Sequence, residues 1–134
     1  MRYLLDVNAL VALGLLNHVF HQRVAKWIRG LGTSPSAQLL TSPITELGMV
    51  RVVAQASQYG FTVAQARTLL TRLKSSKAVT FGFIADDHDV SHLPSWAKGA
   101  KQTTDGHLAQ LAIANDAVLA TLDERIPGAF VIPL

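Results

Sequence analysis

Five short apolar segments, separated by stretches with helical periodicity, constrain the fold of this chain most. The segments are residues 3–5, 38–40, 79–84, 118–120 and 130–132. Apolar runs of this length are typical of buried β-strands. Strands that alternate with helices pair in parallel, because a parallel pair needs a crossover connection and a helix supplies it. We therefore predict an α/β fold with three layers (α/β/α), in which helices cover both faces of a central parallel sheet of about five strands.

Apolar residues between these segments repeat at helical spacing and predict four helices. One covers residues 20–31, one begins at Ser42 and Pro43, one follows the capping pair Thr62 and Gln65, and one covers about 104–115. The residues expected to be buried on the second and third helices are Leu47, Val50, Ala54, Val63, Ala66, Leu70 and Leu73. Residues 91–101 show no periodicity and are predicted to form a loop.

Length and composition predict one soluble domain over residues 1–134. The chain is 49% hydrophobic and only 16% charged, which excludes intrinsic disorder. It has no cysteine, so disulfide frameworks, thiolate zinc sites and cysteine nucleophiles are excluded, and a cytoplasmic location is expected. The apolar run over residues 9–16 is well short of the ~20 residues that span a bilayer, and we expect no signal peptide and no membrane association.

Charge is unevenly distributed around a net value of +3. Residues 18–77 contain eight basic side chains and one acid, whereas residues 86–134 contain seven acids and three basic side chains. A basic half of this kind could bind a polyanion or form the solvated faces of helices, and composition alone slightly favours the solvated faces.

Four acidic residues are predicted to meet at one edge of the sheet. Asp6 ends the first strand, Glu46 lies in the first turn of a helix, Asp105 begins the last helix and Asp123 follows the strand at 118–120. In a parallel sheet the carboxyl ends of the strands and the starts of the following helices share one edge, where such folds bind ligands. Taken singly, each acid is also explained by helix capping or by an ordinary turn.

Four carboxylates at one edge would repel one another unless cations neutralise them. Oxygen ligands of this kind suit Mg²⁺ or Mn²⁺. Divalent metals at such an edge favour phosphodiester chemistry, because a bound metal lowers the pKa of an attacking water and stabilises charge on the phosphate.

Four segments resemble the successive acidic motifs of PIN-domain nucleases, and the VapC-type toxins among them most. The segments are LLDVNAL at 4–10, SPITELGMVRV at 42–52, TTDGHLAQLA at 103–112 and ATLDE at 120–124. The resemblance implies a metal-dependent endoribonuclease that a cognate VapB-like antitoxin holds inactive. Carried over to this chain, it makes Asp6, Glu46, Asp105 and Asp123 the catalytic metal-binding carboxylates, with Asn8 and Thr121 as supporting polar groups.

Two other readings of the acidic edge stay open. In a phosphatase of the haloacid dehalogenase type Asp6 would be a covalent nucleophile, but that motif needs a second aspartate where this chain has Asn8. The other alternative is a catalytically silent PIN fold that binds RNA or protein, against which the presence of all four acids argues.

A second group of metal-binding residue types lies between Asp86 and His92, and a polar turn after a strand explains it as well. His107 lies two residues after Asp105 and is a candidate for the entrance of the site. Trp96 could stack on an exposed base, although packing on the domain is the default expectation.

The apolar composition predicts protein partners, in addition to the RNA substrate that the resemblance implies. We expect a homodimer, because self-association is the commonest way to cover apolar surface. An antitoxin segment is expected in a groove between the helix that contains Trp27 and the helices near Arg51 and Val63. The sequence does not identify the RNA target.

Overall fold

A five-stranded sheet, in the order β3-β2-β1-β4-β5, forms the centre of the molecule. The computed structural model describes residues 1–32, 34 and 36–134. The strands are β1 (Arg2–Leu5), β2 (Gln38–Thr41), β3 (Thr80–Phe83), β4 (Val118–Thr121) and β5 (Phe130–Val131). Neighbouring strands pair in parallel. The five predicted strands and their parallel pairing are therefore confirmed, with ends that differ by one residue at most.

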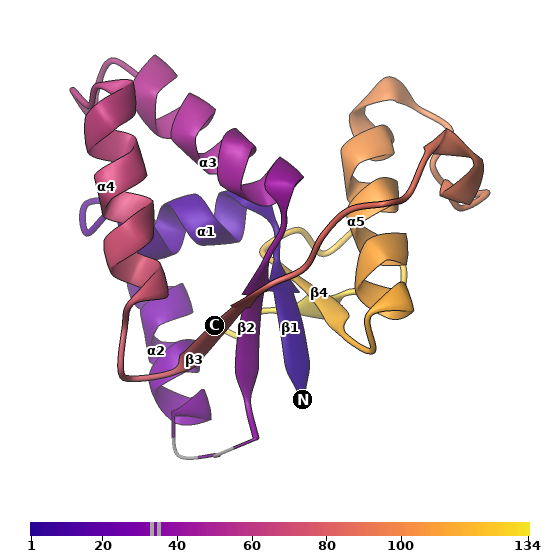
Figure 1. The fold of residues 1–134 in the computed structure, drawn as a ribbon, viewed down its shortest axis with the longest axis horizontal. Helices are drawn as coiled ribbons and strands as arrows, with labels where there is room; N and C mark the ends of the chain where they lie inside the picture. The colour runs from indigo at the N-terminus through magenta and orange to yellow at the C-terminus, as the bar shows by residue number, and fades with distance from the viewer. Residues whose placement is uncertain (33, 35) are drawn as a thin grey trace.

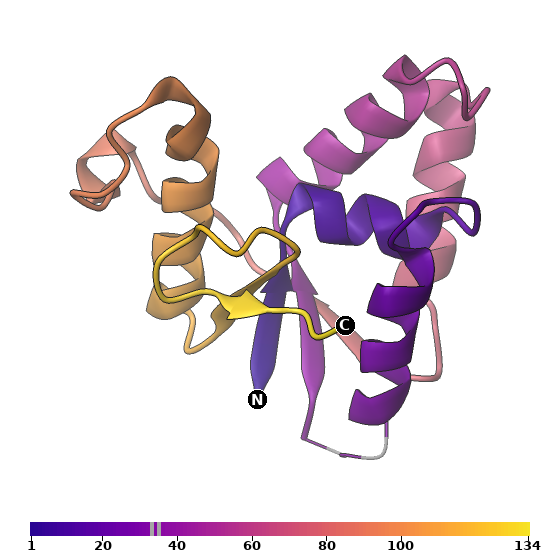
Figure 2. The same ribbon diagram turned by 180° about the vertical axis from the view of Figure 1, so that it is seen from behind.

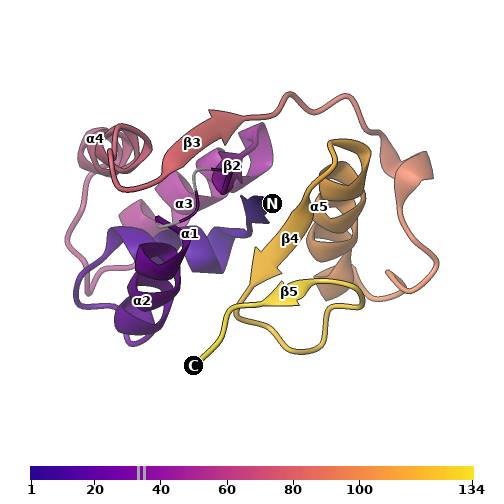
Figure 3. The same cartoon turned by 90° about the horizontal axis from the view of Figure 1, so that it is seen from below.

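Helices cover both faces of the sheet, as predicted. They are α1 (Val7–Gly14), α2 (His21–Leu31), α3 (Pro43–Gln55), α4 (Val63–Lys74) and α5 (Thr103–Ala114). Helices α1 to α4 lie on one side of the sheet, and α5 lies on the other (Figures 1 and 3). The predicted loop at 91–101 contains only the ends of two short 3₁₀ turns, Val90–His92 and Ala100–Gln102.

Helix α1 was not among the predicted helices. Its sequence VNALVALG is apolar at almost every position, so it has no polar face and no helical periodicity. Ala9, Leu10, Val11 and Ala12 are all buried. A short helix that is buried on most sides leaves no amphipathic pattern in the sequence.

The buried face of α3 differs from the prediction. Leu47 is 71% exposed, Val50 and Ala54 are only partly buried, and on α4 Val63 is 58% exposed. The buried residues of α3 are Thr45, Gly48, Met49 and Val53. Because two of these four residues are a threonine and a glycine, which give no apolar signal, apolar periodicity selected the wrong face.

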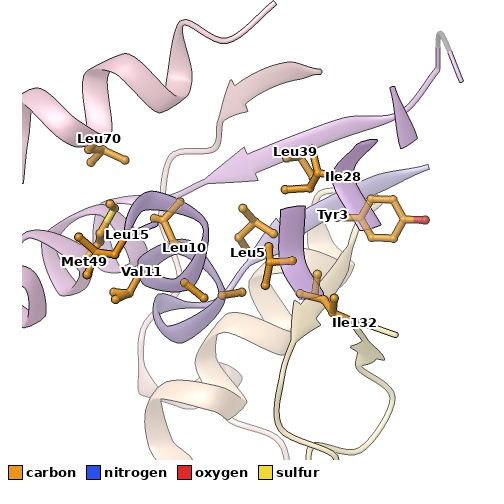
Figure 4. Close-up of a cluster of buried hydrophobic side chains, with 14 of the residues drawn as sticks. Tyr3, Leu5, Leu10, Val11, Leu15, Ile28, Leu39, Met49, Leu70 and Ile132 are labelled. Carbon is orange, nitrogen blue, oxygen red and sulfur yellow. The ribbon is translucent and has the colours of Figure 1, made fainter. Parts of the chain in front are cut away.

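The core has two parts, one on each side of the sheet. Leu5 and Leu39 pack with α1 to α4 in the larger cluster, part of which Figure 4 shows. Leu4 and Leu40 pack with Leu108 and other residues of α5 in the second cluster. Successive strand residues point to opposite faces, so these adjacent leucine pairs fix both helical layers to the central strands. The carboxyl ends of β1, β2 and β4 are thereby held side by side, which positions the residues described next.

Candidate active site

Asp6 lies where β1 ends and α1 begins. Its Oδ1 accepts a hydrogen bond of 2.8 Å from the backbone N–H of Ala9, so Asp6 is the N-cap of α1. Its Oδ2 accepts a hydrogen bond of 2.5 Å from the hydroxyl of Thr121. The residue is only 6% exposed. Both carboxylate oxygens are therefore held in place by groups from different elements.

Thr121 links β1 to the loop after β4. It is fully buried at the end of β4, and the pairing of Leu5 with Ala120 brings it beside Asp6. Its hydroxyl donates to Asp6 and accepts a hydrogen bond of 3.0 Å from the backbone N–H of Asp123. The predicted supporting group thus connects two of the predicted carboxylate residues.

Three aspartates affect one another electrostatically at this edge. Burial first, and the negative charges of Asp105 and Asp123 to a lesser extent, raise the pKa of Asp6 to about 6, against the hydrogen bonds from Thr121 and Ala9, which lower it. Asp105, in the first turn of α5, also has a raised pKa, because it is half-buried and faces the charge of Asp123. The structure therefore brings Asp6, Asp105 and Asp123 together as predicted, although their catalytic role stays a prediction.

Arg125 partly neutralises Asp123. Its guanidinium donates two hydrogen bonds of 3.0 Å, one to each carboxylate oxygen of Asp123, and the arginine side chain is 89% exposed. This bidentate contact lowers the pKa of Asp123. Nothing in the sequence pattern marked Arg125 beforehand, although it stands only two residues from a predicted site residue.

Glu46 is neutralised by Lys74. The Lys74 ammonium lies 2.5 Å from Oε2 of Glu46, and the hydroxyl of Thr41 donates a hydrogen bond of 2.6 Å to the same oxygen. Thr41 ends β2 and is fully buried. We expected four carboxylates without basic partners at this edge, but the charge of Glu46 is balanced by that of Lys74. Lys74 is 28 positions away in the sequence, so no local pattern could have predicted this ion pair.

The donor set fits a hydrated divalent cation. Among the residues that the structure describes, no group of three or more histidine, cysteine, aspartate or glutamate side chains is arranged to hold a metal ion. Mg²⁺, however, usually keeps several waters and binds through one or two carboxylates. Asp6 and Asp105 supply such carboxylates; burial first, and neighbouring negative charge after it, raise the pKa of each, and a bound cation would stabilise both in the charged form.

A hollow of about 610 Å³ borders the site. Asn8, on the first turn of α1, lines it together with Asp123, Arg125 and the residues around Phe20. Asn8 is exposed, so the predicted supporting amide faces open space beside Asp123. Its lining combines these polar and charged side chains with the apolar side chains of Val19, Phe20 and Leu122.

The second acidic and histidine-rich group forms its own set of contacts. Nε2 of His107 lies 2.5 Å from the carboxylate of Asp86, and the ring of His88 stacks on His92 with 4.2 Å between centroids. This turns His107 toward the loop after β3. In the described part of the chain these side chains do not form a metal-binding group. Trp96 is partly buried against the second core cluster, in line with the default expectation.

An apolar groove lies near the predicted antitoxin position but does not include Trp27. Trp27 is buried and packs edge-on against Tyr3, 5.0 Å between ring centroids. The groove instead runs between the end of α1 and α4, and adjoining hollows there are lined by Leu15, Leu16, Tyr59, Phe61, Leu69 and neighbouring residues. Trp27 also lines a separate hollow of about 250 Å³, with Lys26, Gly30 and Leu31 of the same helix. The position of an antitoxin segment between these helices stays a prediction.

A family model, described as the PIN domain, matches residues 3–129. This match covers nearly the whole described fold and all of the residues above. The chain belongs to the PIN-domain family.

Two curated proteins and one solved structure are similar to this chain over most of its length. The chain is 37% identical to ribonuclease VapC38 of Mycobacterium tuberculosis, over 92% of this chain and 86% of that protein. It is 36% identical to ribonuclease VapC44 of the same organism, over 96% and 94%. The fold is similar to that in a crystal structure of VapBC2 from Rickettsia felis bound to a DNA fragment from their promoter, with a TM-score of 0.64, 17% identity and coverage of 97% and 96%. The resemblance stated from the motifs is thus confirmed.

Proposed function

We propose that this protein is a divalent-metal-dependent endoribonuclease, the toxin of a toxin–antitoxin pair. The observation that carries the proposal is the buried Asp6 carboxylate, fixed by Thr121 and Ala9 beside Asp105 at the carboxyl edge of a PIN-domain sheet. The relatives named as VapC ribonucleases support the reaction class. Absence of a cysteine is consistent with action in the cytoplasm.

Each residue of the site has a distinct task in this proposal. Mg²⁺ or Mn²⁺, when bound, would lower the pKa of an attacking water and stabilise charge on the phosphate. Asp6 and Asp105 would hold it, and Thr121 keeps the Asp6 carboxylate in one orientation. Asp123 and Glu46, each with a basic partner, would orient bound water and admit the negatively charged RNA backbone with less repulsion.

The two alternatives make different predictions. A phosphatase of the haloacid dehalogenase type would form a phosphorylated Asp6, but both carboxylate oxygens of Asp6 already accept hydrogen bonds, and Asn8 stands where the general acid is needed. A silent binding module would bind RNA without cleaving it. We expect neither a trapped aspartyl phosphate nor binding without cleavage.

Cleavage of labelled RNA in Mg²⁺, Mn²⁺ and chelator tests the proposal. We expect new RNA ends with either metal and none in chelator. Cleavage that persists in chelator would contradict metal dependence. Intact RNA under all conditions, from a folded protein that binds RNA, would favour the silent module.

We also propose a VapB-like antitoxin and a second copy of this chain as partners. The groove between α1 and α4 is apolar, and several large apolar side chains are more than half exposed, among them Leu16, Val19 and Leu47. Expression of the chain alone should inhibit growth, and co-expression with the neighbouring gene should relieve the inhibition. Sedimentation should give a dimer; harmless expression of a folded monomer would argue against the toxin assignment.

A further inference from the structure

Lys74 brings a positive charge to the Glu46 side of the site. Its ammonium lies 2.5 Å from Oε2 of Glu46, and its side chain is still 32% exposed. An ammonium has three hydrogen-bond donors, and the contact with Glu46 uses one of them. Lys74 can therefore bind a second anionic oxygen without leaving Glu46.

Phe83 presents an aromatic ring to solvent beside this lysine. It is the last residue of β3, is 53% exposed and lies opposite Thr41 in the strand register. The centre of its ring is 5.4 Å from Nζ of Lys74. Since Thr41 donates to Glu46, the ring lies directly beside the groups that hold this carboxylate. Core packing does not explain a phenylalanine that is half in solvent at the ligand-binding edge of the sheet.

The helix that carries Lys74 is basic along its exposed surface. Arg67, Thr71 and Lys74 follow at helical spacing and share a face. Arg67 and Thr71 line a shallow hollow together with Arg72. The chain has no acidic residue between Glu46 and Asp86. Lys74, the last residue of α4, contacts Glu46 in the first turn of α3 and the ring of Phe83 at the end of β3, so the basic face of α4 ends beside Glu46.

We propose that Lys74 and Phe83 form a subsite for single-stranded RNA, in which Lys74 contacts a backbone phosphate and Phe83 stacks on an unpaired base. The inference rests on the proposed ribonuclease function and assigns the part of the surface where the substrate lies next to Glu46. A cation beside an exposed aromatic ring suits single-stranded RNA of any sequence. Every unpaired base has a flat face that can stack on the ring, and every phosphodiester linkage carries a negative charge that the cation can contact. The basic face of α4 extends this contact away from the site.

RNA affinity, measured by fluorescence anisotropy in EDTA, tests the subsite without cleavage. The probe is a fluorescein-labelled single-stranded RNA of mixed sequence. Phe83→Leu should weaken binding about tenfold, the loss expected for one base stack. Lys74→Met should weaken binding about tenfold and make the salt dependence shallower by about one phosphate contact, whereas Lys74→Arg should retain most of the affinity.

Matched substitutions on other helices serve as controls. Lys26→Met removes an exposed positive charge from α2, and Ile113→Ala removes an apolar side chain that is 64% exposed on α5. Each should change RNA affinity less than twofold. Phe83→Trp gives a direct signal for stacking, because its fluorescence should be quenched by RNA to a greater extent than that of the wild type, in which Trp27 is buried and Trp96 is partly buried against the second core cluster.

These measurements distinguish a failure of the proposed subsite from a failure of the proposed ribonuclease function. Wild-type affinity in both Phe83→Leu and Lys74→Met, with cleavage by the wild type intact, would overturn the subsite and leave the ribonuclease assignment in place. A wild type that neither binds nor cleaves RNA would overturn both. If Phe83→Leu changed the sedimentation of the protein but not its RNA affinity, the ring would be a protein contact and the subsite would be wrong.

Discussion

Asp6 combines a structural and a chemical role in one side chain. It caps α1 through Ala9 and accepts the hydroxyl hydrogen of Thr121, yet it is buried close to the charges of Asp105 and Asp123. The hydrogen bonds favour the charged carboxylate, whereas burial and the neighbouring charges disfavour it. The raised pKa shows that burial outweighs the hydrogen bonds. A residue in this position is held firmly but at a cost in stability.

This cost makes the stability of the metal-free protein depend on pH. The pKa of Asp6 is about 6 in the folded protein against 3.8 when unperturbed, so the folded state binds the proton more tightly than the unfolded state. The stabilisation by this proton is full below about pH 4 and is lost as the pH rises through 6, a change of roughly 3 kcal/mol at most. Asp6→Asn should remove this pH dependence and be as stable as the wild type at pH 7, or more stable.

Chemical denaturation in chelator between pH 4 and 8 measures the effect. Other groups titrate in both proteins, so the difference between wild type and Asp6→Asn is the relevant quantity. A variant that is clearly less stable than the wild type at pH 7 would mean that the capping role of Asp6 dominates.

Thr121 should be needed for both stability and activity. In Thr121→Val the hydroxyl is lost, so the carboxylate of Asp6 and the backbone N–H of Asp123 each lose a partner. We expect a loss of about 1–3 kcal/mol in the free energy of unfolding, together with reduced cleavage. Thr121→Ser, which keeps the hydroxyl, should recover most of both. An unchanged melting temperature and cleavage rate in Thr121→Val would show that the hydroxyl of Thr121 contributes to neither stability nor activity.

Among the strands and helices, those with a clear local pattern of apolar or capping residues were predicted correctly from the sequence. Each strand was visible as a short apolar run, and the caps formed by Ser42 and Thr62 are present in the structure. Helix α1 was missed because it is apolar on all sides. The predicted buried face of α3 was wrong because the true one includes a threonine and a glycine beside Met49 and Val53, and the first two carry no apolar signal.

In the candidate site too, the positions of the acids could be predicted, whereas their basic partners could not. Strand ends and helix starts placed the acids at one edge, since parallel topology alone determines where they lie. The basic partners of two of these acids were not predicted. Lys74 reaches Glu46 from another helix, 28 positions away, so this pair has no local sequence signature. Arg125 is only two residues from Asp123, but their contact depends on the conformation of the turn after β4.

Gly48 sets the distance between α1 and α3. A Cβ atom at this position would lie 2.6 Å from Cγ2 of Val7, which is too close for either helix to stay in place. Gly48→Ala should therefore destabilise the protein by about 1–3 kcal/mol, although alanine favours helices over glycine by about 1 kcal/mol. Val7 cannot easily turn away because it is β-branched.

The double substitution provides the control. Val7→Ala combined with Gly48→Ala removes the clash and should be more stable than Gly48→Ala alone when melting temperatures are compared. Because Val7 follows Asp6 directly, Gly48→Ala should also reduce cleavage. A single variant as stable as the wild type would show that the two helices can move apart freely.

Across the whole molecule, the sheet joins the two halves of the core. Leu4 and Leu5 belong to different clusters but are adjacent in β1, so neither helical layer can separate without disrupting the central strands. None of the helices formed by the described residues is long and apolar enough to cross a membrane. We propose that residues 1–134 unfold as a single cooperative unit.

Calorimetry of the metal-free protein tests this proposal. We expect one transition whose calorimetric and van't Hoff enthalpies agree for the unit that unfolds. Two separate transitions, one of them sensitive to substitutions in α5 alone, would instead indicate independent layers.

The aspartates at the carboxyl edge of the sheet are the proposed centre of RNA cleavage. The most direct measurement is the cleavage rate of labelled RNA in Mg²⁺ for Asp105→Asn and for Asp87→Asn. Asp87 is a matched control because its side chain is 95% exposed in the loop after β3. We expect Asp105→Asn to lose at least a hundredfold in rate while it stays folded, and Asp87→Asn to cleave like the wild type. Equal rates in the two variants would contradict the assignment of this edge as the active site.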